Sequence, residues 1–541
     1  MAKKRLTGDE LVKRTLEDWE QAKSGRANWN SLYETVADFV RPDVSFLGSR
    51  TPGTRNDYRI FDGTAVIAHG ELANTLEGTL MNSQIRWLSL VPEDPSIDVD
   101  DDEVERWLYA ASSALLRQFD SANTNFTLAA HETLIDLTSW GTAAMELIER
   151  DDGFRFSCHP LNSIYLQGDD DTGEIDGVFR CFRRTGNRCL ATWDKLPEKM
   201  AKAMDADPKR EFEIVHAVQN RRIRDAGKVN SRNKPWSSIY LCTDTREMIG
   251  EESGFDSMPI LTPRWEVAPG ELYGRSPAIK AIADIKSINL MALNVLEATE
   301  LTIRPPLMVP ANGIEGELST APGSILYVKS GTREFPQPLN HGAKPDFGEF
   351  EIDRRERKIN QHFLTDRLRL PDQDRMTATE ILARQRQALL VFSPYLGRLY
   401  SEFLNPIVYR TFIALQKRNG LPPNPPAALA RANLMVAYTS PLAASRGASQ
   451  YDAASAVLQM VLPLANAKPT AIDTLDTDRI IRLVARASGL DPRAIVTKKK
   501  VMQMEAERAQ AMQMQQQSEV AVNAGNALKS LAAAGGSNGG R

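Results

Sequence analysis

Cysteine is scarce in this chain of 541 residues, and its four cysteines do not suggest a disulfide framework. They stand at Cys158, Cys181, Cys189 and Cys242, and no two of them form a CxxC pair. A scaffold held together by disulfides would carry many more cysteines for its length. We therefore expect all four to be reduced thiols.

Long apolar runs are also missing. No segment approaches eighteen consecutive apolar residues, which is about the length that crosses a bilayer as a helix. The start, "MAKKRLTGDELVKRTLEDWE", has basic residues but no apolar core of the length found in signal peptides. We expect neither membrane insertion nor secretion, and hence an intracellular origin without a membrane partner.

The chain lacks an excess of positive charge. Its formal net charge is −4, so it does not have the overall basic character of a tight nucleic-acid binder. Any contact with DNA should be weak or local. With 42% hydrophobic and 25% charged residues, the chain can bury a large core, and its length suggests several domains.

Motifs for nucleotide, metal and acyl chemistry are absent. No GxxxxGK[ST] loop occurs, and the six histidines form no HExxH or other paired spacing. "GRSPA" lacks the closing glycine of a nucleophile elbow. "QGDDDTGEIDG" lacks the glycine and glutamate of an EF-hand in register, so we interpret it as a polar hairpin tip. We expect no cofactor, no metal and no enzymatic activity, although paired carboxylates of a nuclease stay open because Asp and Glu are abundant.

The chain does contain one long predicted helix, with residues typical of a helix start at one end and of a helix stop at the other. Ser276 can cap it and Pro277 fits its first position, while Pro305 and Pro306 cannot continue it. The predicted helix runs from Pro277 to Arg304, about 42 Å at 1.5 Å per residue. Its apolar residues recur every three or four positions and form a narrow stripe that we expect to pack against neighbouring subunits, with Ile282, Ile285, Ile288, Ala292 and Val295 as its main members.

The rest of the chain predicts an α+β fold that is mainly α. The first 150 residues have helical periodicity, including "FTLAAHETLIDLTSWGTAAMELIE", and alternation from Phe154 to about Glu266 predicts a β-rich insert. After the long helix, a Pro- and Gly-rich segment with two β-like runs predicts a small module, and residues 346–368 predict a helix that returns antiparallel to the first.

Two further helical regions follow. A capping box of Thr377 and Glu380 predicts the start of a long helix that Pro394 and Pro406 should kink or segment, and Asn419-Gly420 should end it. From residue 497 the sequence favours a helix with a weak apolar face, followed by the flexible tail "GGSNGGR".

Runs of one charge have ordinary explanations. "DVDDDEVERW" places carboxylates at a helix N-terminus, where they complement the helix dipole. "DRRERK" on the returning helix and the lysines at 498–500 lack interleaved aromatic residues for base stacking, so solvated helix faces are the default interpretation. The alternative is that a few of these cations meet a passing polyanion.

Several of these segments together resemble the head-to-tail connecting proteins, or portal proteins, of short-tailed podovirus-type phages. The resemblance rests on their order over roughly Leu11 to Gly489. The matching segments are "RANWNSLYETVADFVRP", "RIFDGTA", "NFTLAAHETLIDLTSWGTAAMELIE", "FRFSCHPLNSIYLQGDDDTGEIDGVFRCFRRT", "ELYGRSPAIKAIADIKSINLM", "RPPLMVP", "MTATEILARQRQALL" and "YTSPLAASR". "RIFDGTA" has Gly63 where a serine is expected, a departure that concerns local turn geometry only.

The resemblance implies a ring, usually of twelve subunits, at one vertex of the phage head. It implies these parts: a wing (1–270), a first stem helix (271–304), a clip (305–346), a second stem helix (347–365), a tunnel loop (366–376), long kinked wing helices (377–440), a crown (441–496), and a C-terminal barrel helix with a flexible tail (497–541). The narrow stripe of the long helix would then pack between identical copies.

The implied partners are capsid and scaffolding proteins, a terminase motor, tail adaptor proteins and double-stranded DNA that passes through the ring. The implied location is the virion, after assembly in the host cytoplasm. Our candidates for the channel lining are Arg367, Arg369, Gln373 and Arg375 in the loop, and Lys329 and Arg333 in the clip. Another phage ring-assembly protein, such as a tail adaptor or internal scaffold, is the main alternative, and a packaging-associated nuclease is the third.

Overall fold

The computed structural model describes residues 8–47, 57–99, 101–150, 153–169, 172–193, 195–225, 227–228, 230–309, 314–315, 327–328, 337–338, 345–368, 392–430, 432–438, 457, 461, 476–487 and 490–535. The chain divides into two compact units. The first comprises Met1–Ser83 and Arg117–Leu415, and the second comprises Gln84–Leu116 and Gln416–Arg541. The fold is α+β, as predicted. None of the described helices is both long and apolar enough to span a membrane.

Helices open the first unit. They are α1 (Asp9–Gly25), α2 (Ala27–Val40), α3 (Thr64–Leu80) and α5 (Phe126–Trp140), with a 3-10 turn, η1 (Asp57–Arg59), before α3. α2 buries Tyr33, Val36, Ala37 and Val40, which follow the three- and four-residue spacing seen in the sequence. The prediction of helices in this region is therefore confirmed.

One part of that prediction was wrong. Helical periodicity was extended through residue 149, but α5 ends at Trp140 and strand β2 (Met145–Arg150) follows. Gly141 ends the helix with a φ of 84°, a left-handed conformation that glycine adopts readily. The apolar residues after it are buried in a sheet, and a short apolar run alone does not distinguish a buried strand from a buried helix.

Two antiparallel sheets make up the predicted β-rich insert. A five-stranded sheet has the order β4-β5-β6-β7-β8, and a three-stranded sheet has the order β3-β2-β9. Their remaining strands are β3 (Gly153–Cys158), β4 (Ile164–Gly168), β5 (Ile175–Thr185), β6 (Glu211–Asn220), β7 (Trp236–Cys242), β8 (Glu247–Phe255) and β9 (Ile260–Leu261). The acidic segment predicted as a hairpin tip does connect β4 to β5.

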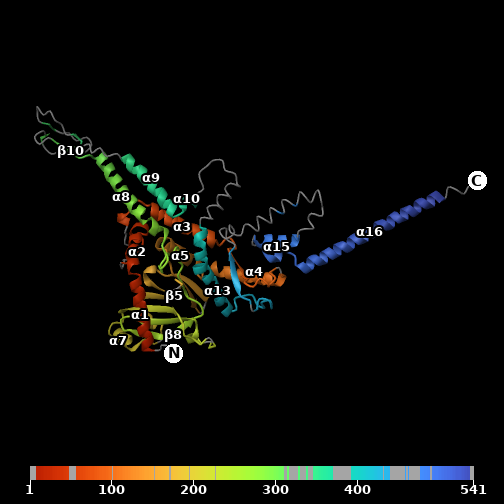
Figure 1. Ribbon diagram of the computed structural model, residues 1–541, viewed down its shortest axis with the longest axis horizontal. Coiled ribbons are helices and arrows are strands. Elements are labelled where there is room, and N and C mark those ends of the chain that lie inside the picture. Colours follow the sequence, from red (N-terminus) through yellow and green to blue (C-terminus); the bar gives the residue numbers. More distant parts are fainter. Residues whose placement is uncertain are drawn as a thin grey trace, which may run out of the picture. The chain divides into compact units, whose positions relative to one another are not determined.

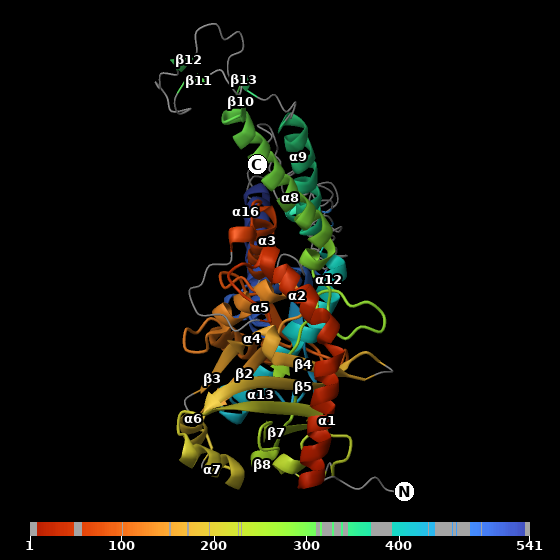
Figure 2. The same ribbon diagram turned by 90° about the vertical axis from the view of Figure 1, so that its left-hand side faces the viewer.

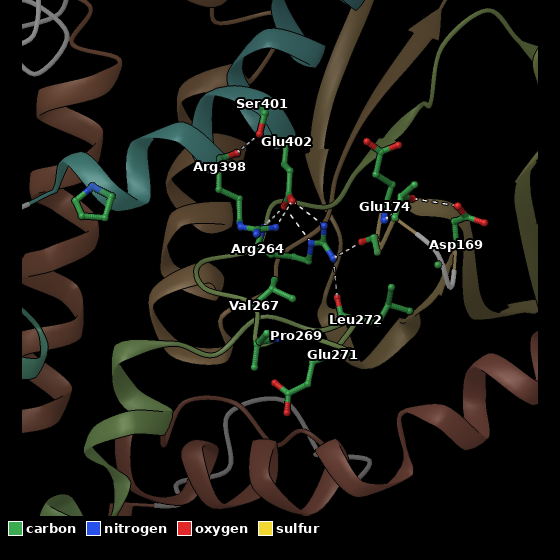
Figure 3. Close-up of a pocket in the computed structure, with 16 residues that line it drawn as sticks. Asp169, Glu174, Arg264, Val267, Pro269, Glu271, Leu272, Arg398, Ser401 and Glu402 are labelled. Atoms are coloured by element: carbon green, nitrogen blue, oxygen red, sulfur yellow. Dashed lines mark hydrogen bonds and ion pairs between the residues drawn. The ribbon is translucent and has the colours of Figure 1, made fainter.

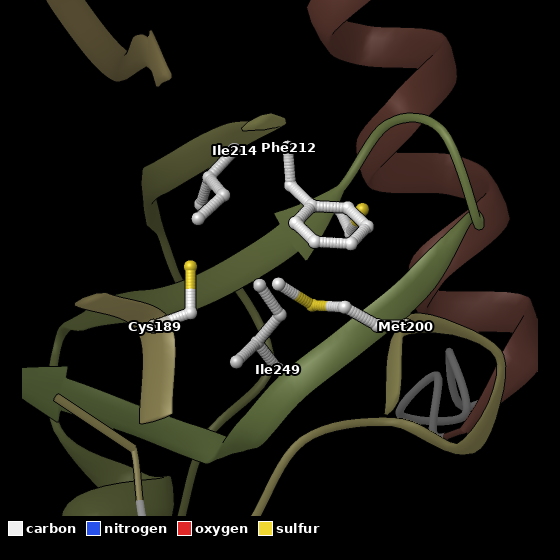
Figure 4. Close-up of a cluster of buried hydrophobic side chains, with 6 residues drawn as sticks. Cys189, Met200, Phe212, Ile214 and Ile249 are labelled. Atoms are coloured by element: carbon white, nitrogen blue, oxygen red, sulfur yellow. The ribbon is translucent and has the colours of Figure 1, made fainter. Parts of the chain in front are cut away.

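Short helices interrupt the insert. α6 (Gly186–Leu190) and α7 (Glu198–Ala206) lie between β5 and β6, and η2 (Leu161–Ser163) and η3 (Ser231–Asn233) are 3-10 turns. The side chains of Cys189, Met200, Phe212, Ile214, Cys242 and Ile249 form a buried cluster there (Figure 4). Trp19 and Ala22 of α1 pack with Phe179 and Val215 in another cluster. The five-stranded sheet thus packs against α6 and α7 in one cluster and against α1 in the other.

A helical hairpin is the next element of the first unit. α8 (Pro277–Ile303) and α9 (Pro345–His362) run side by side in both views (Figures 1 and 2). Two short antiparallel strand pairs lie between them in sequence: β10 (Leu307–Met308) with β13 (Gln337–Pro338), and β11 (Ile314–Glu315) with β12 (Tyr327–Val328). The long helix and its antiparallel return are therefore confirmed. α10 (Thr365–Leu368) follows α9.

The predicted proline interruptions occur in the last helices of this unit. α12 (Ser393–Leu399) starts with Pro394 in its first turn, and α13 (Asn405–Lys417) has Pro406 as its second residue. Between them lies a π turn, η4 (Tyr400–Leu404), which accommodates the missing N–H of the proline. Asn419 has a φ of 53° just after α13, as a helix-ending residue should. The capping box at Thr377 and Glu380 lies outside the described residues.

The second unit joins segments that are far apart in sequence. Strand β1 (Leu88–Pro92) pairs with β14 (Leu434–Tyr438), and Trp87 stacks on Tyr438. Helix α4 (Asp102–Phe119) begins in this unit, which also contains α15 (Thr477–Ala487), the 3-10 turn η6 (Pro492–Ala494) and α16 (Lys498–Gly535). The predicted C-terminal helix is confirmed. The grouping of residues 84–116 with the C-terminal part was not predicted.

Candidate assembly site on the helical hairpin

The start of α8 is fixed by a close backbone contact in the first unit. Ser276 is fully buried, and its Oγ accepts from Ile279 N at 2.9 Å and donates to Ser139 O at 2.7 Å. The predicted N-cap is therefore confirmed. Gly141 and Gly274 lie so close together that a Cβ on Gly141 would come within 2.5 Å of Gly274 O. Only glycine fits here, so the direction of α8 depends on this contact with the end of α5.

Asn289 holds a remote loop against the middle of α8. Its Oδ1 accepts from Phe61 N at 2.7 Å and Asp62 N at 3.3 Å, and its Nδ2 donates to Arg59 O at 2.8 Å. Asp62 in turn binds the first residue of α3, because its Oδ1 accepts from Thr64 N at 3.1 Å. These contacts give a structural role to the "RIFDGTA" segment. From the sequence alone, Asn289 had no particular role.

The departure at Gly63 is harmless in this structure. Gly63 is the N-cap residue of α3 with a φ of −95°, and a Cβ added to it would have no atom within 4 Å. The serine expected at this position would therefore fit without rearrangement.

The two helices of the hairpin hold each other by an ion pair and by close packing. Arg355 Nη1 of α9 lies 2.8 Å from Asp284 Oδ1 of α8. Further along, Gly348 faces Val295, since a Cβ on Gly348 would lie 2.4 Å from Val295 Cγ2. The hairpin is thus a packed pair within one subunit.

The predicted stripe of α8 is largely covered by the same chain. Ile285 and Ile288 are only 3% and 1% exposed, so their side chains are already buried within the subunit. Ile282, Ala292 and Val295 are half-buried, and Val295 packs on Gly348. Contact of this stripe with sister copies remains a prediction, and it now concerns only the half-buried members.

Other apolar side chains of α8 are left uncovered. Leu296 is 57% exposed and Ile303 is 72% exposed, and Leu290 and Leu301 are also exposed. The sequence prediction did not include these residues, although Leu296 and Ile303 lie eleven and eighteen positions after Ile285 on the side of the stripe; Leu290 and Leu301 lie on another side of the helix. Large apolar side chains gathered on one exposed element typically mark a contact surface. We name Leu290, Leu296, Leu301 and Ile303 the apolar ridge of α8.

Most of the exposed side chains of α9 are charged or polar, although Phe350 is 69% exposed. Arg354 lies 3.6 Å from Glu351, and Arg357 and Lys358 are exposed. In the "DRRERK" run, Arg355 therefore points toward α8, and the other cations face solvent in the single chain. These exposed cations agree with the default interpretation of a solvated helix face. Of the six candidate channel residues, Arg369, Gln373, Arg375, Lys329 and Arg333 lie outside the described residues. Arg367 belongs to α10, but its side chain is not described.

A polar pocket of about 820 Å³ lies elsewhere in the first unit, between the β4–β5 turn, the loop 267–272 and α12 (Figure 3). Its central ion pair joins Arg264 Nη2 to Glu402 Oε1 at 2.7 Å, and Arg398 Nη1 lies 2.6 Å from the same oxygen. Arg264 also donates to Leu272 O at 3.1 Å. Arg264, Glu402 and Arg398 are engaged with one another, and they connect α12 and η4 to the loop before α8.

A buried polar cluster lies between the two sheets. His159 Nε2 is 2.7 Å from Glu146 Oε2, and Arg180 Nη1 is 3.4 Å from the same oxygen. Burial would raise the pKa of Glu146, but the hydrogen bond with His159 and the neighbouring charges lower it below its usual value. His216 stacks on Tyr240, and burial lowers the pKa of His216 to about 4. His216 is therefore neutral at physiological pH.

All four cysteines are free thiols, and burial favours the neutral form of three of them. Burial raises the pKa of Cys158 and Cys189, and it raises that of Cys181 to about 12. Among the residues that the structure describes, no three His, Cys, Asp or Glu side chains are grouped so that they could hold a metal ion.

An α+β subunit with a rigid helical hairpin and an uncovered apolar ridge belongs to the class of proteins that assemble with other chains. Residues 12–496 match the family described as bacteriophage head to tail connecting protein, and the chain belongs to this family. It is 28% identical over 521 residues to the "Probable portal protein" of Bordetella phage BPP-1, which covers 93% of this chain and 92% of that protein. It is also 28% identical over 536 residues to the "Portal protein" of Salmonella phage epsilon15, which covers 96% and 95%.

The protein is therefore a phage head-to-tail connector, or portal protein, and a structural component of the virion rather than an enzyme. The family resemblance inferred from the order of short segments is confirmed over nearly the whole chain.

Proposed function

We propose that copies of this chain close into a ring of twelve at one vertex of the capsid, through which double-stranded DNA enters during packaging and leaves during ejection. The ring would offer docking surfaces to capsid and scaffolding proteins, a terminase motor and tail adaptor proteins. The observation that carries this proposal is the family match over residues 12–496. The apolar ridge of α8 supports it, because a single chain leaves this surface exposed to water.

In this proposal α8 and α9 form the stem, the strand pairs between them form the clip, and the helices and sheets before α8 form the wing. Residues 441–496 would form the crown, and α16 would associate with its copies. The ridge of α8 would contact the neighbouring stem, while the charged exposed side of α9 would face the channel or solvent. Because the net charge of each chain is −4, DNA would meet only local cations and would not be held tightly.

The ring itself is tested by native mass spectrometry and electron microscopy of the purified protein. We expect an annular particle of one stoichiometry. The substitution Leu296→Arg should lower the ring fraction about tenfold or more, because burying an unpaired charge in the subunit contact costs at least 1.4 kcal/mol. Glu251→Arg places the same side chain at an exposed position of β8, outside the hairpin, and should assemble normally.

Two results would overturn the assembly proposal. One is a well-folded monomer at every concentration. The other is equal ring formation by Leu296→Arg and the wild type, which would remove the ridge from the subunit contact.

The channel assignment needs a separate experiment in phage particles. Reversing the charge of Arg367, Arg369, Arg375, Lys329 and Arg333, together with Gln373→Glu, should shorten the packaged genome or release DNA early, since phosphate contacts depend on cations. Packaged genome length and DNA retention are measured against Arg14→Glu, a reversal at an exposed position of α1, outside the proposed stem, clip and tunnel loop. If the six changes leave both quantities unchanged, these residues do not act on the DNA.

A further inference from the structure

The C-terminal helix α16 is held by the second unit only at its beginning. Its side chains are exposed from Met502 to Ala527, and α15 and α4 lie at its base (Figure 1). Within the described part of the chain, its hydrogen bond to another element is the one made by the backbone N–H of Lys498. The direction in which α16 leaves the fold is therefore decided at one joint.

One carboxylate connects three helices at this joint. Asp102 is the first residue of α4, and its Oδ2 accepts from Lys498 N of α16 at 3.0 Å. Its Oδ1 accepts from Arg482 Nη1 of α15 at 3.1 Å. Arg482 Nη2 donates to Val496 O at 2.9 Å, just before α16 begins. Arg482 is only 4% exposed, so its charge relies on the partners inside the joint.

Of the neighbouring acidic residues in α4, Glu105 also approaches Arg482, with its Oε2 3.7 Å from Nη1, but among the described residues Asp102 is the one that accepts from α16. Asp101 caps its own helix, because its Oδ1 accepts from Glu103 N at 2.8 Å. Glu103 is exposed in the first turn of α4. The acidic run before Trp107 therefore does more than complement the dipole of α4, since Asp102 serves the start of a different helix.

The electrostatics at the start of α16 require such a group. The N-terminus of a helix carries partial positive charge, and Lys498, Lys499 and Lys500 add three positive charges at this end. This combination is unfavourable unless a carboxylate lies close to the first N–H groups. Asp102 is the carboxylate that accepts from the first of these N–H groups.

We propose that Asp102 is a latch that fixes the direction of α16, so that loss of this single carboxylate frees the C-terminal helix to swing while the rest of the fold stays intact. The latch lies within one chain and does not depend on ring formation. The orientation of α16 thus depends on Asp102, a residue about four hundred positions earlier in the sequence.

Hydrogen–deuterium exchange of the full-length chain tests the latch. We expect Asp102→Ala to raise the exchange rate of amides in residues 490–504 by about tenfold, the effect of losing one charge-assisted hydrogen bond at a helix end. Asp102→Asn keeps an acceptor oxygen but loses the charge, so it should give a smaller increase. Exchange of the first unit should stay unchanged in both variants.

Glu103→Ala is the matched control, because it removes the same charge from the same turn without touching α15 or α16. It should exchange like the wild type. The proposal is overturned if Asp102→Ala leaves the exchange rates of residues 490–504 unchanged. It is also overturned if Glu103→Ala raises these rates equally, because Asp102 would then act only through the overall charge of this turn. If Asp102→Ala fails to fold, the comparison of Asp102→Asn with Glu103→Gln decides in the same way.

Discussion

Arg264 shows at the scale of one residue how a buried charge connects distant segments. Its guanidinium binds Glu402 on the π turn before α13 and a carbonyl of the loop that leads to α8. Glu402 lies in the π turn, and Pro406 stands four residues after it, in the first turn of α13. The interruption that the sequence predicted at this proline thus lies close to the ion-pair partner of Arg264.

We predict that Glu402→Ala destabilises the first unit by about 3 to 5 kcal/mol, because it leaves the guanidinium of Arg264 buried without its carboxylate. Differential scanning calorimetry or denaturant unfolding measures the loss. Glu251→Ala breaks the ion pair with Arg232, whose side chains are 85% and 56% exposed, and should change stability by no more than about 1 kcal/mol. Equal effects of the two variants would contradict a structural role for the buried pair.

The buried side chain of His216 makes the free energy of unfolding depend on pH. Its pKa in the folded chain is about 4, below the ordinary 6.5, so between these values the unfolded chain binds a proton that the folded chain does not. The groups that face it are Glu146, Arg180 and His159. The contribution of His216 to the free energy of unfolding is therefore fully present above about pH 6.5. It falls by about 3 kcal/mol as the pH drops to 4.

Unfolding measured from pH 7 to pH 4 checks this dependence on His216. His216→Gln should flatten part of the curve, whereas His362→Gln at the exposed end of α9 should leave the slope of the wild type. The pKa of Glu146 is also lowered in the folded chain, so some loss of stability in acid should remain in both variants. An unchanged slope in His216→Gln would exclude His216 as the source.

At the scale of elements, the contact between the end of α5 and the start of α8 sets the course of the hairpin. Gly141→Ala should destabilise the first unit by about 3 kcal/mol or more, because it combines a φ of 84° with a Cβ that would clash with backbone atoms. Gly78→Ala in the exposed part of α3 meets no atom within 4 Å and should instead stabilise by about 0.5 to 1 kcal/mol. Thermal unfolding of both variants measures the difference, and a well-folded Gly141→Ala would disprove the contact.

The elements also show what a sequence can and cannot predict. Ser276, Pro277 and the two prolines after Arg304 act through local backbone geometry, so they placed both ends of α8 to within a residue. Strand β2 was missed because a short apolar run is compatible with either a buried helix or a buried strand. Only its pairing with β3 and β9 distinguishes the two. The pairing of β1 with β14 joins positions more than three hundred residues apart, and no local pattern encodes it.

The candidate assembly site was predicted only in part. Periodicity identified the stripe of Ile285 and Ile288, but it could not tell that α9 and the helices before the sheet would cover these side chains within one subunit. The exposed ridge is defined by what remains uncovered, which is a property of the folded chain. Asn289 was missed for a related reason, since its partners are backbone atoms and carry no sequence pattern.

At the scale of the whole molecule, α16 should contribute little to the stability of a single chain. Deleting residues 505–541 keeps the joint at Asp102 and removes side chains that are exposed where the structure describes them. The melting temperature of the dissociated chain should change by no more than about 2 °C, since little buried surface is lost. Scanning fluorimetry at a concentration below ring assembly measures this, and a larger decrease would mean that α16 folds back on its own subunit.

Asn289 has a consequence for how this family of sequences can vary. Its side chain binds only main-chain atoms of Arg59, Phe61 and Asp62, so it places no demand on which side chains those three positions carry. Mutations can therefore accumulate in that loop under constraints of their own, whereas position 289 must keep a short amide that offers one acceptor and one donor. In a comparison of many connectors, position 289 should keep an amide side chain even in sequences where Arg59 or Phe61 is replaced.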